Sequence, residues 1–347
     1  SILNSRFFRN FVSKLQLLNI MLLKKLTLPE LLSNSCSKFK NNLSLNFVQS
    51  GKRTYQDFYN EVTSIANYLL SSGIQKGDKI AILSANMPNW GITQFAIARI
   101  GAIAVPVLPG FSSIEIQNIL EHSESKIIFV SKLLYKLVAD IKTSYLEEKI
   151  LMNTFARIPE DYPVEAIDKL ENNIGLDNLT PLPAIQVEEE DTASIIYTSG
   201  TTGFSKGVEL THRNLVWNAR QCATIQPVSI QDRFLSILPL AHTYENTLGL
   251  LLPVMFGAQI YYLDRVPTPK LLVPAMQKIR PTVMLSVPLI IEKIYKTQVL
   301  PKFTSSALMK TLYNFGPTRK LFNRLAGKKL MQTFGGKIVF FGIGGSK

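Results

Sequence analysis

Histidine and cysteine are scarce in this sequence of 347 residues. It has three histidines, His122, His212 and His242, and two cysteines, Cys36 and Cys222. The cysteines stand far apart and form no CxxC pair, which speaks against a disulfide framework and fits a reducing compartment such as the cytosol. With so few histidines and no cluster of them, a zinc site built from several imidazoles is not expected either.

The apolar stretches are too short to span a bilayer. The stretch 248–263 falls short of the roughly 20 residues that a spanning helix needs, and Pro253 and Gly257 interrupt it. It therefore predicts a core segment. Hydrophobic residues make up 46% of the chain, which is enough to bury the core of one large or two ordinary globular domains.

Acidic residues are absent before Glu30, where basic residues alternate with phenylalanine and leucine. Three interpretations of residues 1–20 stay open: an organelle-targeting presequence, an amphipathic helix lying on a membrane, or upstream codons wrongly joined to a start at Met21. Charged and apolar residues are interleaved, so no secretory signal is indicated. Residues 1–20 are thus a basic amphipathic tail or a mis-joined extension, outside a domain that covers 21–347.

Basic residues outnumber acidic residues by 38 to 25, which gives a formal net charge of +13. Such a surplus favours nucleic acid, anionic lipid, or small anions such as ATP and fatty carboxylates as partners. No basic run reaches five residues and no nucleic-acid motif appears, which speaks against nucleic acid. We expect the acidic run 188–191 to be solvated rather than to bind a metal.

Strand-like apolar segments alternate with segments of helical periodicity. Residues 55–70, for example, carry an apolar stripe at the 3.6-residue period of a helix. The predicted strands are 78–83, 102–107, 126–130, 233–238, 258–263, 283–287 and 336–342; the predicted helices are 55–70, 90–100, 113–122, 213–223, 247–255, 271–279, 288–298 and 302–330; residues 151–190 are a loop-rich connection. Continuously apolar strands separated by helices indicate an α/β fold with mostly parallel sheets flanked by helices.

Residues 197–208 read Tyr-Thr-Ser-Gly-Thr-Thr-Gly-Phe-Ser-Lys-Gly-Val and follow the apolar run 193–196. This composition predicts a phosphate-binding loop. Glycines let backbone N–H groups approach an anion, the hydroxyl side chains add donors, and Lys206 adds a positive charge. The spacing differs from a Walker A motif, in which the lysine directly follows a glycine and precedes serine or threonine.

The loop resembles the signature of the adenylate-forming (AMP-binding) superfamily, which includes acyl-CoA synthetases, luciferases and peptide-synthetase adenylation domains. Eleven of twelve positions match, and Ser205 stands where the family usually has proline. The segment 286–295 resembles the version found in long-chain fatty acid–CoA ligases. The resemblance covers about 26–347 and implies the large N-terminal domain of the acyl-CoA synthetase and luciferase type.

The resemblance also implies a set of site residues. ATP would be bound by Thr198, Ser199, Gly200, Thr201, Thr202, Gly203, Lys206, Gly344 and Gly345. Two residues would act in catalysis: Lys206 would neutralise the charge that develops on pyrophosphate, and His242 would face the carboxylate. The implied cofactors are ATP and Mg²⁺, with CoA as co-substrate, and the metal ligand is unknown.

Three further polar residues near these motifs have structural interpretations. We expect Glu245 to begin a helix, where a carboxylate faces the positive end of the macrodipole. His212 and Asn214 are expected to cap the helix that follows the loop, and His122 to lie on the surface.

The implied activity is ATP-dependent conversion of a long-chain fatty acid to acyl-adenylate and then to acyl-CoA, with release of pyrophosphate and AMP. The family's adenine, ribose and Mg²⁺ phrases and its small C-terminal domain have no counterpart here, so we expect a fragment or truncated relative, incomplete at its C-terminal end. Two alternatives stay open: a fatty acyl-AMP ligase that loads a carrier protein, and an inactive membrane-associated relative. The expected location is the cytoplasm, with peripheral membrane contact as an open alternative.

Overall fold

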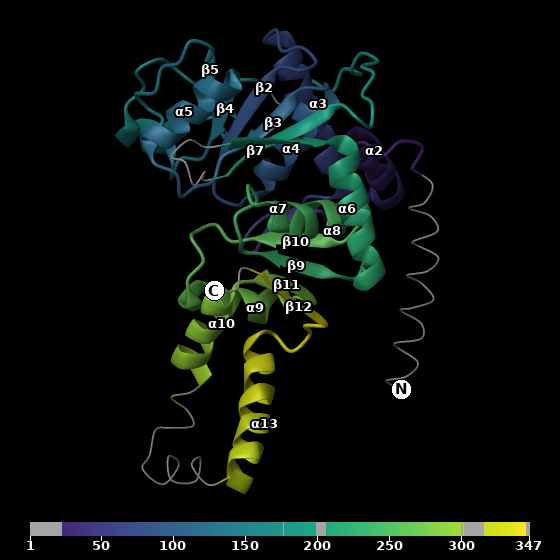
Figure 1. The fold of residues 1–347 in the computed structure, drawn as a ribbon, viewed down its shortest axis with the longest axis vertical. Helices are drawn as coiled ribbons and strands as arrows, with labels where there is room; N and C mark the ends of the chain where they lie inside the picture. The colour runs from purple at the N-terminus through teal and green to yellow at the C-terminus, as the bar shows by residue number, and fades with distance from the viewer. Residues whose placement is uncertain (1–22, 176, 199–205, 300, 302–315, 345–347) are drawn as a thin grey trace.

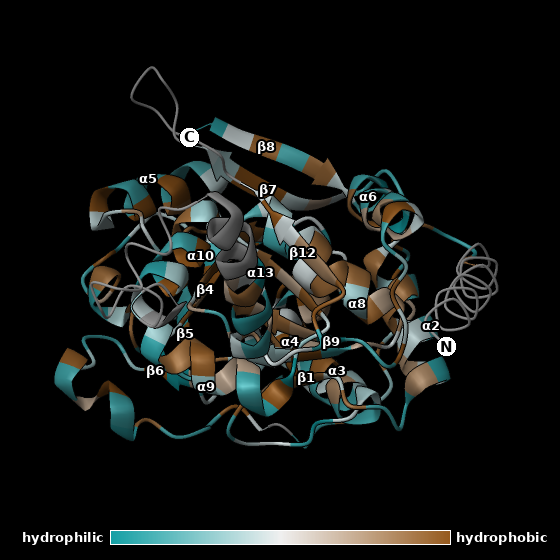
Figure 2. Cartoon of the chain, turned by 90° about the horizontal axis from the view of Figure 1, so that it is seen from below, coloured by the Kyte–Doolittle hydropathy of each residue, from teal (hydrophilic) through white to brown (hydrophobic). Residues whose placement is uncertain are grey.

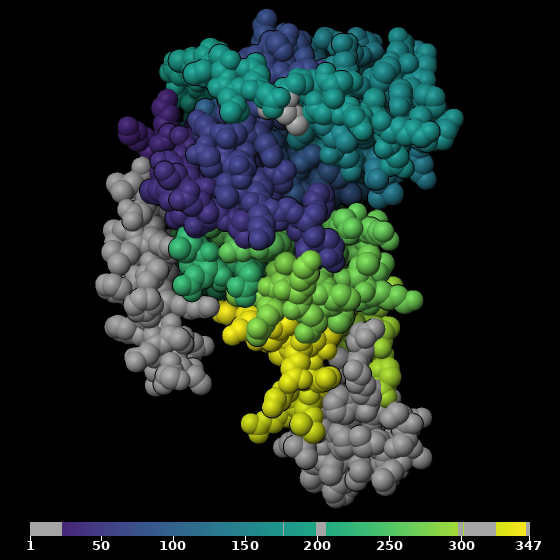
Figure 3. All heavy atoms as spheres, turned by 180° about the vertical axis from the view of Figure 1, so that it is seen from behind, coloured from purple at the N-terminus to yellow at the C-terminus, as the bar shows by residue number. Residues whose placement is uncertain are grey.

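The chain forms two β-sheets with a layer of helices between them (Figure 1). The computed structural model describes residues 23–175, 177–198, 206–299, 301 and 316–344. In the space-filling view, most blue and teal residues lie in one lobe, built on the seven-stranded sheet, and most green and yellow residues lie in the other, built on the five-stranded sheet, to which residues 45–47 also belong (Figure 3). We call these the first and second lobes.

The first sheet contains seven strands in the order β6-β5-β4-β2-β3-β7-β8. Its central strands are parallel, whereas β6 and β8 run antiparallel to their neighbours at the two edges. The strands are β2 (Lys79–Leu83), β3 (Ile103–Pro106), β4 (Ser125–Val130), β5 (Glu148–Leu151), β6 (Ala156–Ile158), β7 (Thr192–Thr198) and β8 (Lys206–Thr211).

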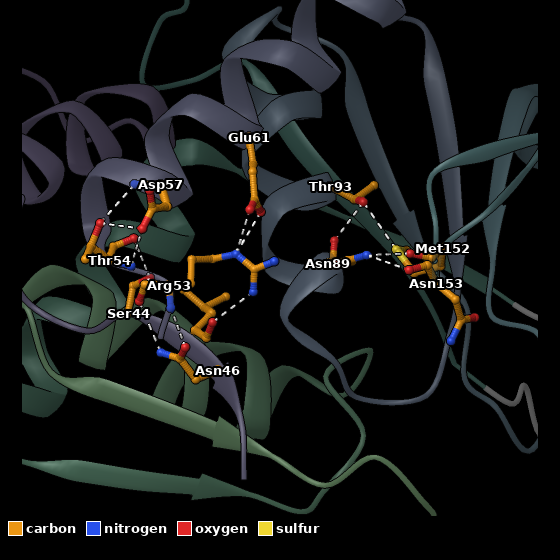
Figure 4. Close-up of polar contacts among 11 residues, drawn as sticks. Ser44, Asn46, Arg53, Thr54, Asp57, Glu61, Asn89, Thr93, Met152 and Asn153 are labelled. Atoms are coloured by element: carbon orange, nitrogen blue, oxygen red, sulfur yellow. Dashed lines mark hydrogen bonds and ion pairs between the residues drawn. The ribbon is translucent and has the colours of Figure 1, made fainter. Parts of the chain in front are cut away.

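The second sheet contains five strands, all parallel, in the order β1-β10-β9-β11-β12. They are β1 (Leu45–Phe47), β9 (Arg233–Ser236), β10 (Gln259–Tyr262), β11 (Val283–Ser286) and β12 (Phe340–Ile343). Arg53 supports β1, because its backbone N–H donates to Asn46 Oδ1 at 2.6 Å and its guanidinium pairs with Glu61 at 2.8 Å (Figure 4). An N-terminal strand is thereby built into the sheet of the second lobe.

The helices begin where the sequence offers caps. Side chain and backbone form reciprocal capping boxes at Thr54 with Asp57, and at Ser112 with Glu115. The α-helices are α2 (Leu28–Phe39), α3 (Tyr55–Ser71), α4 (Pro88–Arg99), α5 (Ser113–Ser123), α6 (His212–Ile225), α7 (Thr243–Glu245), α8 (Leu252–Met255), α9 (Pro269–Ile279), α10 (Pro288–Ile294) and α13 (Gly316–Thr333); the 3₁₀-helices are η1 (Tyr135–Leu137) and η2 (Val164–Lys169), and the π-helices are η3 (Asn246–Leu251) and η4 (Tyr295–Val299).

Alternate residues of each strand face different helical layers. In β2, Ile80 and Ile82 pack into the core between the sheets, whereas Ala81 and Leu83 pack into the core on the outer side with α5 residues. The second sheet likewise divides its residues between the central core and an outer core with α9. Helix α4 lies in the central layer and is buried on nearly all sides. The strands and inner helices are accordingly brown in the hydropathy view (Figure 2).

The α/β architecture with mostly parallel sheets is confirmed, and several boundaries differ. Strands β1, β5 and β6 were not predicted, because three or four residues are too few to show a period. Strands β7 and β8 were not predicted either, because the residues that join them were interpreted as a phosphate-binding loop. The predicted helix 247–255 corresponds to the π-helix η3 followed by α8, the predicted helix 288–298 is formed by α10 followed by the π-helix η4, and the predicted strand 336–342 is shifted to β12. Residues 1–20, and residues 302–315 of the last predicted helix, lie outside the described part of the chain. No helix in the described part is long and apolar enough to cross a membrane.

Candidate active site

The candidate site lies at the carboxyl edge of the second sheet. Because β9, β11 and β12 are parallel neighbours, their carboxyl ends at Ser236, Ser286 and Ile343 meet at one edge. His242 is in the connection after β9, and Gly344 follows β12 and donates its N–H to the Ser286 carbonyl at 3.1 Å. Open α/β sheets bind their ligands outside this edge.

His242 occupies the N-cap position of α7 and its side chain is exposed. Its Nδ1 accepts a hydrogen bond from the backbone N–H of Tyr244 at 3.2 Å. A neutral imidazole whose Nδ1 accepts carries its proton on Nε2. His242 can therefore offer an Nε2–H donor to a carboxylate.

Tyr244 packs against the end of β12. A Cβ atom added at Gly342 would lie 2.7 Å from Tyr244 Oη and 2.8 Å from Leu285 Cδ2, and one added at Gly344 would lie 3.2 Å from the tyrosine ring. A side chain at Gly342 would have to displace Tyr244 or Leu285. Burial, followed by the nearby Glu245, raises the pKa of Tyr244, which keeps its phenol protonated. The contact places Gly344 close to the loop of His242.

An apolar cavity of about 110 Å³ lies beside Gly342. Leu285 and Phe340 belong to its wall and also surround the Gly342 position. Ile225 in the same wall is 82% exposed, so the cavity reaches the surface. The lining comes from α6, the segment after α6, η3, α8 and three strands, as Cys222, Ile225, Gln226, Val228, Phe234, Leu248, Leu252, Val283, Leu285 and Phe340. Apolar cavities of this size hold apolar ligands rather than water.

The predicted phosphate loop connects the antiparallel strands β7 and β8. Thr198 ends β7 and pairs in register with Lys206, which begins β8, and both side chains are exposed. Lys206 is therefore a strand residue at the base of a hairpin. Gly207 allows β8 to approach β7 closely, since a Cβ there would lie 2.9 Å from Ile195 Cγ2.

Six of the predicted ATP-binding residues lie outside the described residues: Ser199, Gly200, Thr201, Thr202, Gly203 and Gly345. The structure brings His242 and Gly344 together through Tyr244, and Thr198 and Lys206 together across the hairpin. Within the described part of the chain, no hydrogen bond or ion pair connects the two pairs.

The predicted capping role is confirmed for Asn214 and is wrong for His212. Thr211 caps α6 in a capping box with Asn214, whereas His212 is fully buried and its Nδ1 accepts from the Leu28 N–H at 3.3 Å. Burial lowers the pKa of His212 to about 4. His122 is exposed, as predicted, but its Nδ1 also lies 2.7 Å from the hydroxyl of Tyr197.

The acidic run 188–191 is ion-paired rather than only solvated. Glu188 pairs with Lys25 at 2.8 Å, Asp191 with Lys76 at 2.6 Å, and Glu190 with Arg213 at 2.9 Å. The run thus connects residues before α2 and after α3 with the start of α6. No group of three or more histidine, cysteine or acidic side chains suited to a metal ion occurs among the residues described.

Glu245 is in the first turn of α7, as predicted, but it does not act as an exposed charge. It is 1% exposed, Ser236 Oγ donates to its Oε1 at 2.6 Å, and burial raises its pKa to about 8. At neutral pH the side chain is mainly the uncharged acid, which interacts little with the helix macrodipole.

Sequence reasoning missed the buried polar residues that hold the His242 loop. Asn86 contacts Ser236, Leu238 and Leu240, and Gln94 contacts Asn246. The available signal was an asparagine in the short segment between β2 and the proline that begins α4. That signal marks a turn, and it does not identify the partner 150 residues away.

Comparisons with known proteins identify the family to which the chain belongs. The AMP-binding enzyme family matches residues 32–338. The chain is similar to the long-chain-fatty-acid–CoA ligase FadD15 of Mycobacterium bovis, at 31% identity over 69% of this chain and 39% of that protein. It is also similar to the medium-chain fatty-acid–CoA ligase of Escherichia coli, at 28% identity over 67% of this chain and 41% of that protein. The chain thus spans less than half the length of these two relatives.

Solved structures share the fold. A putative long-chain-fatty-acid CoA ligase from Rhodopseudomonas palustris superposes with a TM-score of 0.66 at 21% identity, over 79% of this chain and 66% of that chain. The family match extends over most of the sequence, including the first sheet, the second sheet except β12, and the His242 loop. The chain therefore belongs to the AMP-binding enzyme family and has the fold of the N-terminal domain of its acyl-CoA ligases.

Proposed function

We propose that the chain carries the adenylation site of a long-chain fatty acid–CoA ligase. The observation that supports this substrate class is the apolar cavity beside Gly342. Its wall touches the position next to Tyr244, two residues after the expected carboxylate-binding His242. In the proposed arrangement, a fatty acid would place its carboxylate at the edge of the sheet and its alkyl chain in the cavity.

The small size of the cavity and its opening to the surface favour substrates whose alkyl chains can differ in length. About 110 Å³ is somewhat smaller than the roughly 150 Å³ engineered cavity that binds benzene. The cavity can thus enclose only a short part of a long alkyl chain. Because Ile225 in its wall is exposed, the remaining carbons would leave beside this residue.

In the proposed reaction, a carboxylate oxygen attacks the α-phosphorus of ATP, a new oxygen–phosphorus bond forms, and the bond to the β-phosphate bridging oxygen breaks. Pyrophosphate leaves with its electron pair. The Nε2–H of His242 would donate to the carboxylate, and Lys206 would offset charge on the departing pyrophosphate. Mg²⁺ bound with ATP would supply further charge neutralisation.

In the second step, the sulfur of CoA attacks the acyl carbon and AMP leaves. CoA is the proposed acceptor because the two relatives described above are named as CoA ligases. Among the described residues, the exposed Thr198 and Lys206 at the base of the hairpin would contact the phosphates.

Cysteine alkylation tests whether an alkyl chain occupies the cavity. Cys222 lines the cavity and is partly exposed, whereas Cys36 is 4% exposed and burial raises its pKa to about 12. A maleimide should therefore label Cys222. Palmitate, held below its micelle concentration, should slow this labelling at least about tenfold, because the bound chain covers the thiol.

Acetate is the matched control, since it has the carboxylate without the chain and should leave the labelling rate unchanged. The Cys222→Ser variant should lack the palmitate-sensitive maleimide labelling, which identifies Cys222 as the labelled residue. A labelling rate at Cys222 that is the same with and without palmitate would contradict the assignment of the cavity.

A further inference from the structure

We propose that Asn86 of the first lobe is the positioning residue for His242 of the second lobe, an inference that rests on the proposed function. The side chain of Asn86 fixes the backbone between β9 and α7. It thereby sets where the His242 ring meets the substrate carboxylate.

Asn86 contacts three alternate residues of this connection. Its Nδ2 donates to Ser236 Oγ at 3.0 Å and to the Leu238 carbonyl at 2.5 Å, and its Oδ1 accepts from the Leu240 N–H at 3.0 Å. The Asn86 side chain thus uses its amide nitrogen as a donor and its amide oxygen as an acceptor. Aspartate has the same shape but, when ionised, can only accept hydrogen bonds, so it cannot replace the two donated bonds.

A second side-chain amide of the first lobe, that of Gln94, holds the other end of this connection by pairing with Asn246. Gln94 of α4 and Asn246 exchange two hydrogen bonds, of 3.3 and 3.1 Å. The Asn246 N–H donates to the His242 carbonyl at 3.0 Å, and its side-chain amide reaches the Leu240 carbonyl at 3.4 Å. The β2–α4 segment thus fixes the residues on both sides of His242.

The His242 side chain has little support of its own. It is exposed, and its hydrogen bond within the described structure is to the Tyr244 N–H. Its location therefore depends on the backbone at 238–242. Misplacing a catalytic group by about 1 Å can cost on the order of 100-fold in rate. Loss of the Asn86 contacts should consequently act on catalysis through His242.

Asn89 provides a matched control within the same lobe. Its Nδ2 donates to the Met152 carbonyl at 2.7 Å and the Asn153 carbonyl at 3.3 Å (Figure 4), and like Asn86 it is half-buried. It does not contact the connection after β9 among its described hydrogen bonds. Asn89→Asp therefore removes comparable bonds without touching the His242 loop.

The experiment is a double-mutant cycle on the full-length protein, with palmitate-dependent exchange of pyrophosphate into ATP as the measurement. We expect Asn86→Asp to lower kcat about 100-fold and to change KM for ATP less than about twofold. In a His242→Ala background, Asn86→Asp should cost less than about twofold more, since it acts through the same group. Asn89→Asp should lower kcat by less than about threefold in either background.

Hydrogen exchange checks the contact independently of activity. In Asn86→Ala, the Leu240 amide should lose protection, because its acceptor is removed, whereas the Val107 amide, bonded to the Ile82 carbonyl at 2.9 Å, should keep its protection. Unchanged protection at Leu240 would overturn the inference.

The outcomes separate this inference from the function on which it rests. A wild-type protein that shows no exchange with any fatty acid overturns both. Exchange in the wild type, combined with an Asn86→Asp cost that is equally large with and without His242, overturns the positioning role alone. If Asn86→Asp lowers kcat only when His242 is present, the result supports both the positioning role and the proposed function.

Discussion

Glu245 is buried without a charged partner, and this decides its protonation. Ser236 donates to its Oε1, whereas its Oε2 has no hydrogen-bond partner within the described residues. Removing a carboxylate from water costs more than removing the neutral acid, which is why burial raises the pKa of Glu245 to about 8. The polar residues beneath the His242 loop are therefore uncharged at neutral pH.

The titration of Glu245 predicts a stability that falls as pH rises. Between pH 4.5 and 8 the unfolded chain releases this proton and the folded chain keeps it, so ionisation favours unfolding. Glu245→Gln removes the titrating group at constant shape. Relative to the wild type, we expect its free energy of unfolding to gain up to about 4 kcal/mol between pH 5 and 8.5. Urea denaturation at each pH measures this difference.

Glu115→Gln is the control, because the pH dependence of stability that this carboxylate contributes has the opposite sign. The backbone and side chain of Ser112 lower the pKa of Glu115 in the capping box of α5. Its stabilising contribution is present above the unfolded pKa and is lost in acid. A Glu245→Gln effect that is the same at pH 5 and pH 8.5 would contradict a neutral Glu245.

Several elements meet at the start of α6, and the ion-paired run 188–191 connects them. Leu28 at the beginning of α2 donates to the ring of His212, and the His212 and Arg213 N–H groups donate to the carbonyls of Asp191 and Glu189. His212 Nε2 is buried and has no partner in the part of the chain that the structure describes. The junction of α2, β7 and α6 thus requires a neutral imidazole.

Protonation of His212 should loosen this junction. Burial, partly opposed by Asp191, lowers the pKa of His212 to about 4. Between pH 6.5 and 4 the unfolded chain binds a proton that the folded chain excludes, so stability falls with pH by up to about 3 kcal/mol. The His212→Asn variant keeps a hydrogen-bond acceptor for the Leu28 N–H but has no imidazole to titrate. We therefore expect it to lack this fall in stability. The free energy of unfolding at pH 4.5 and 7 measures it.

Gln221→Asn, on the exposed face of the same helix, is the matched control and should keep the pH dependence of the wild type. If His212→Asn kept that dependence as well, the buried neutral imidazole would be refuted.

Elements were predictable from sequence where the pattern was long. The stripe at 55–70 gave α3 almost to the residue, whereas β1 and β6, of three residues each, show no period. The resemblance indicated His242 and Gly344 as site residues, whereas their adjacency became visible only in the structure, where parallel strands end at one edge. The role of Asn86 could not be predicted, because its partners are 150 to 154 residues away and depend on how two sheets pack.

At the scale of the whole molecule, the candidate site depends on both lobes. The hairpin with Thr198 and Lys206 belongs to the first sheet, whereas His242, Tyr244 and Gly344 follow strands of the second. The first lobe also supplies the amides that hold the His242 loop. The relative position of the lobes therefore sets the distance between the Lys206 hairpin and the His242 loop.

The most direct test of the proposed function is the exchange of labelled pyrophosphate into ATP by the full-length protein with single carboxylic acids. We predict exchange that is supported by octanoate and palmitate, whose alkyl chains can enter the apolar cavity, that is not supported by acetate, and that falls about 100-fold in His242→Ala. Amino acids should not support it. An absence of exchange with every acid of eight to eighteen carbons, in a protein that unfolds cooperatively, would contradict fatty acid activation at this site.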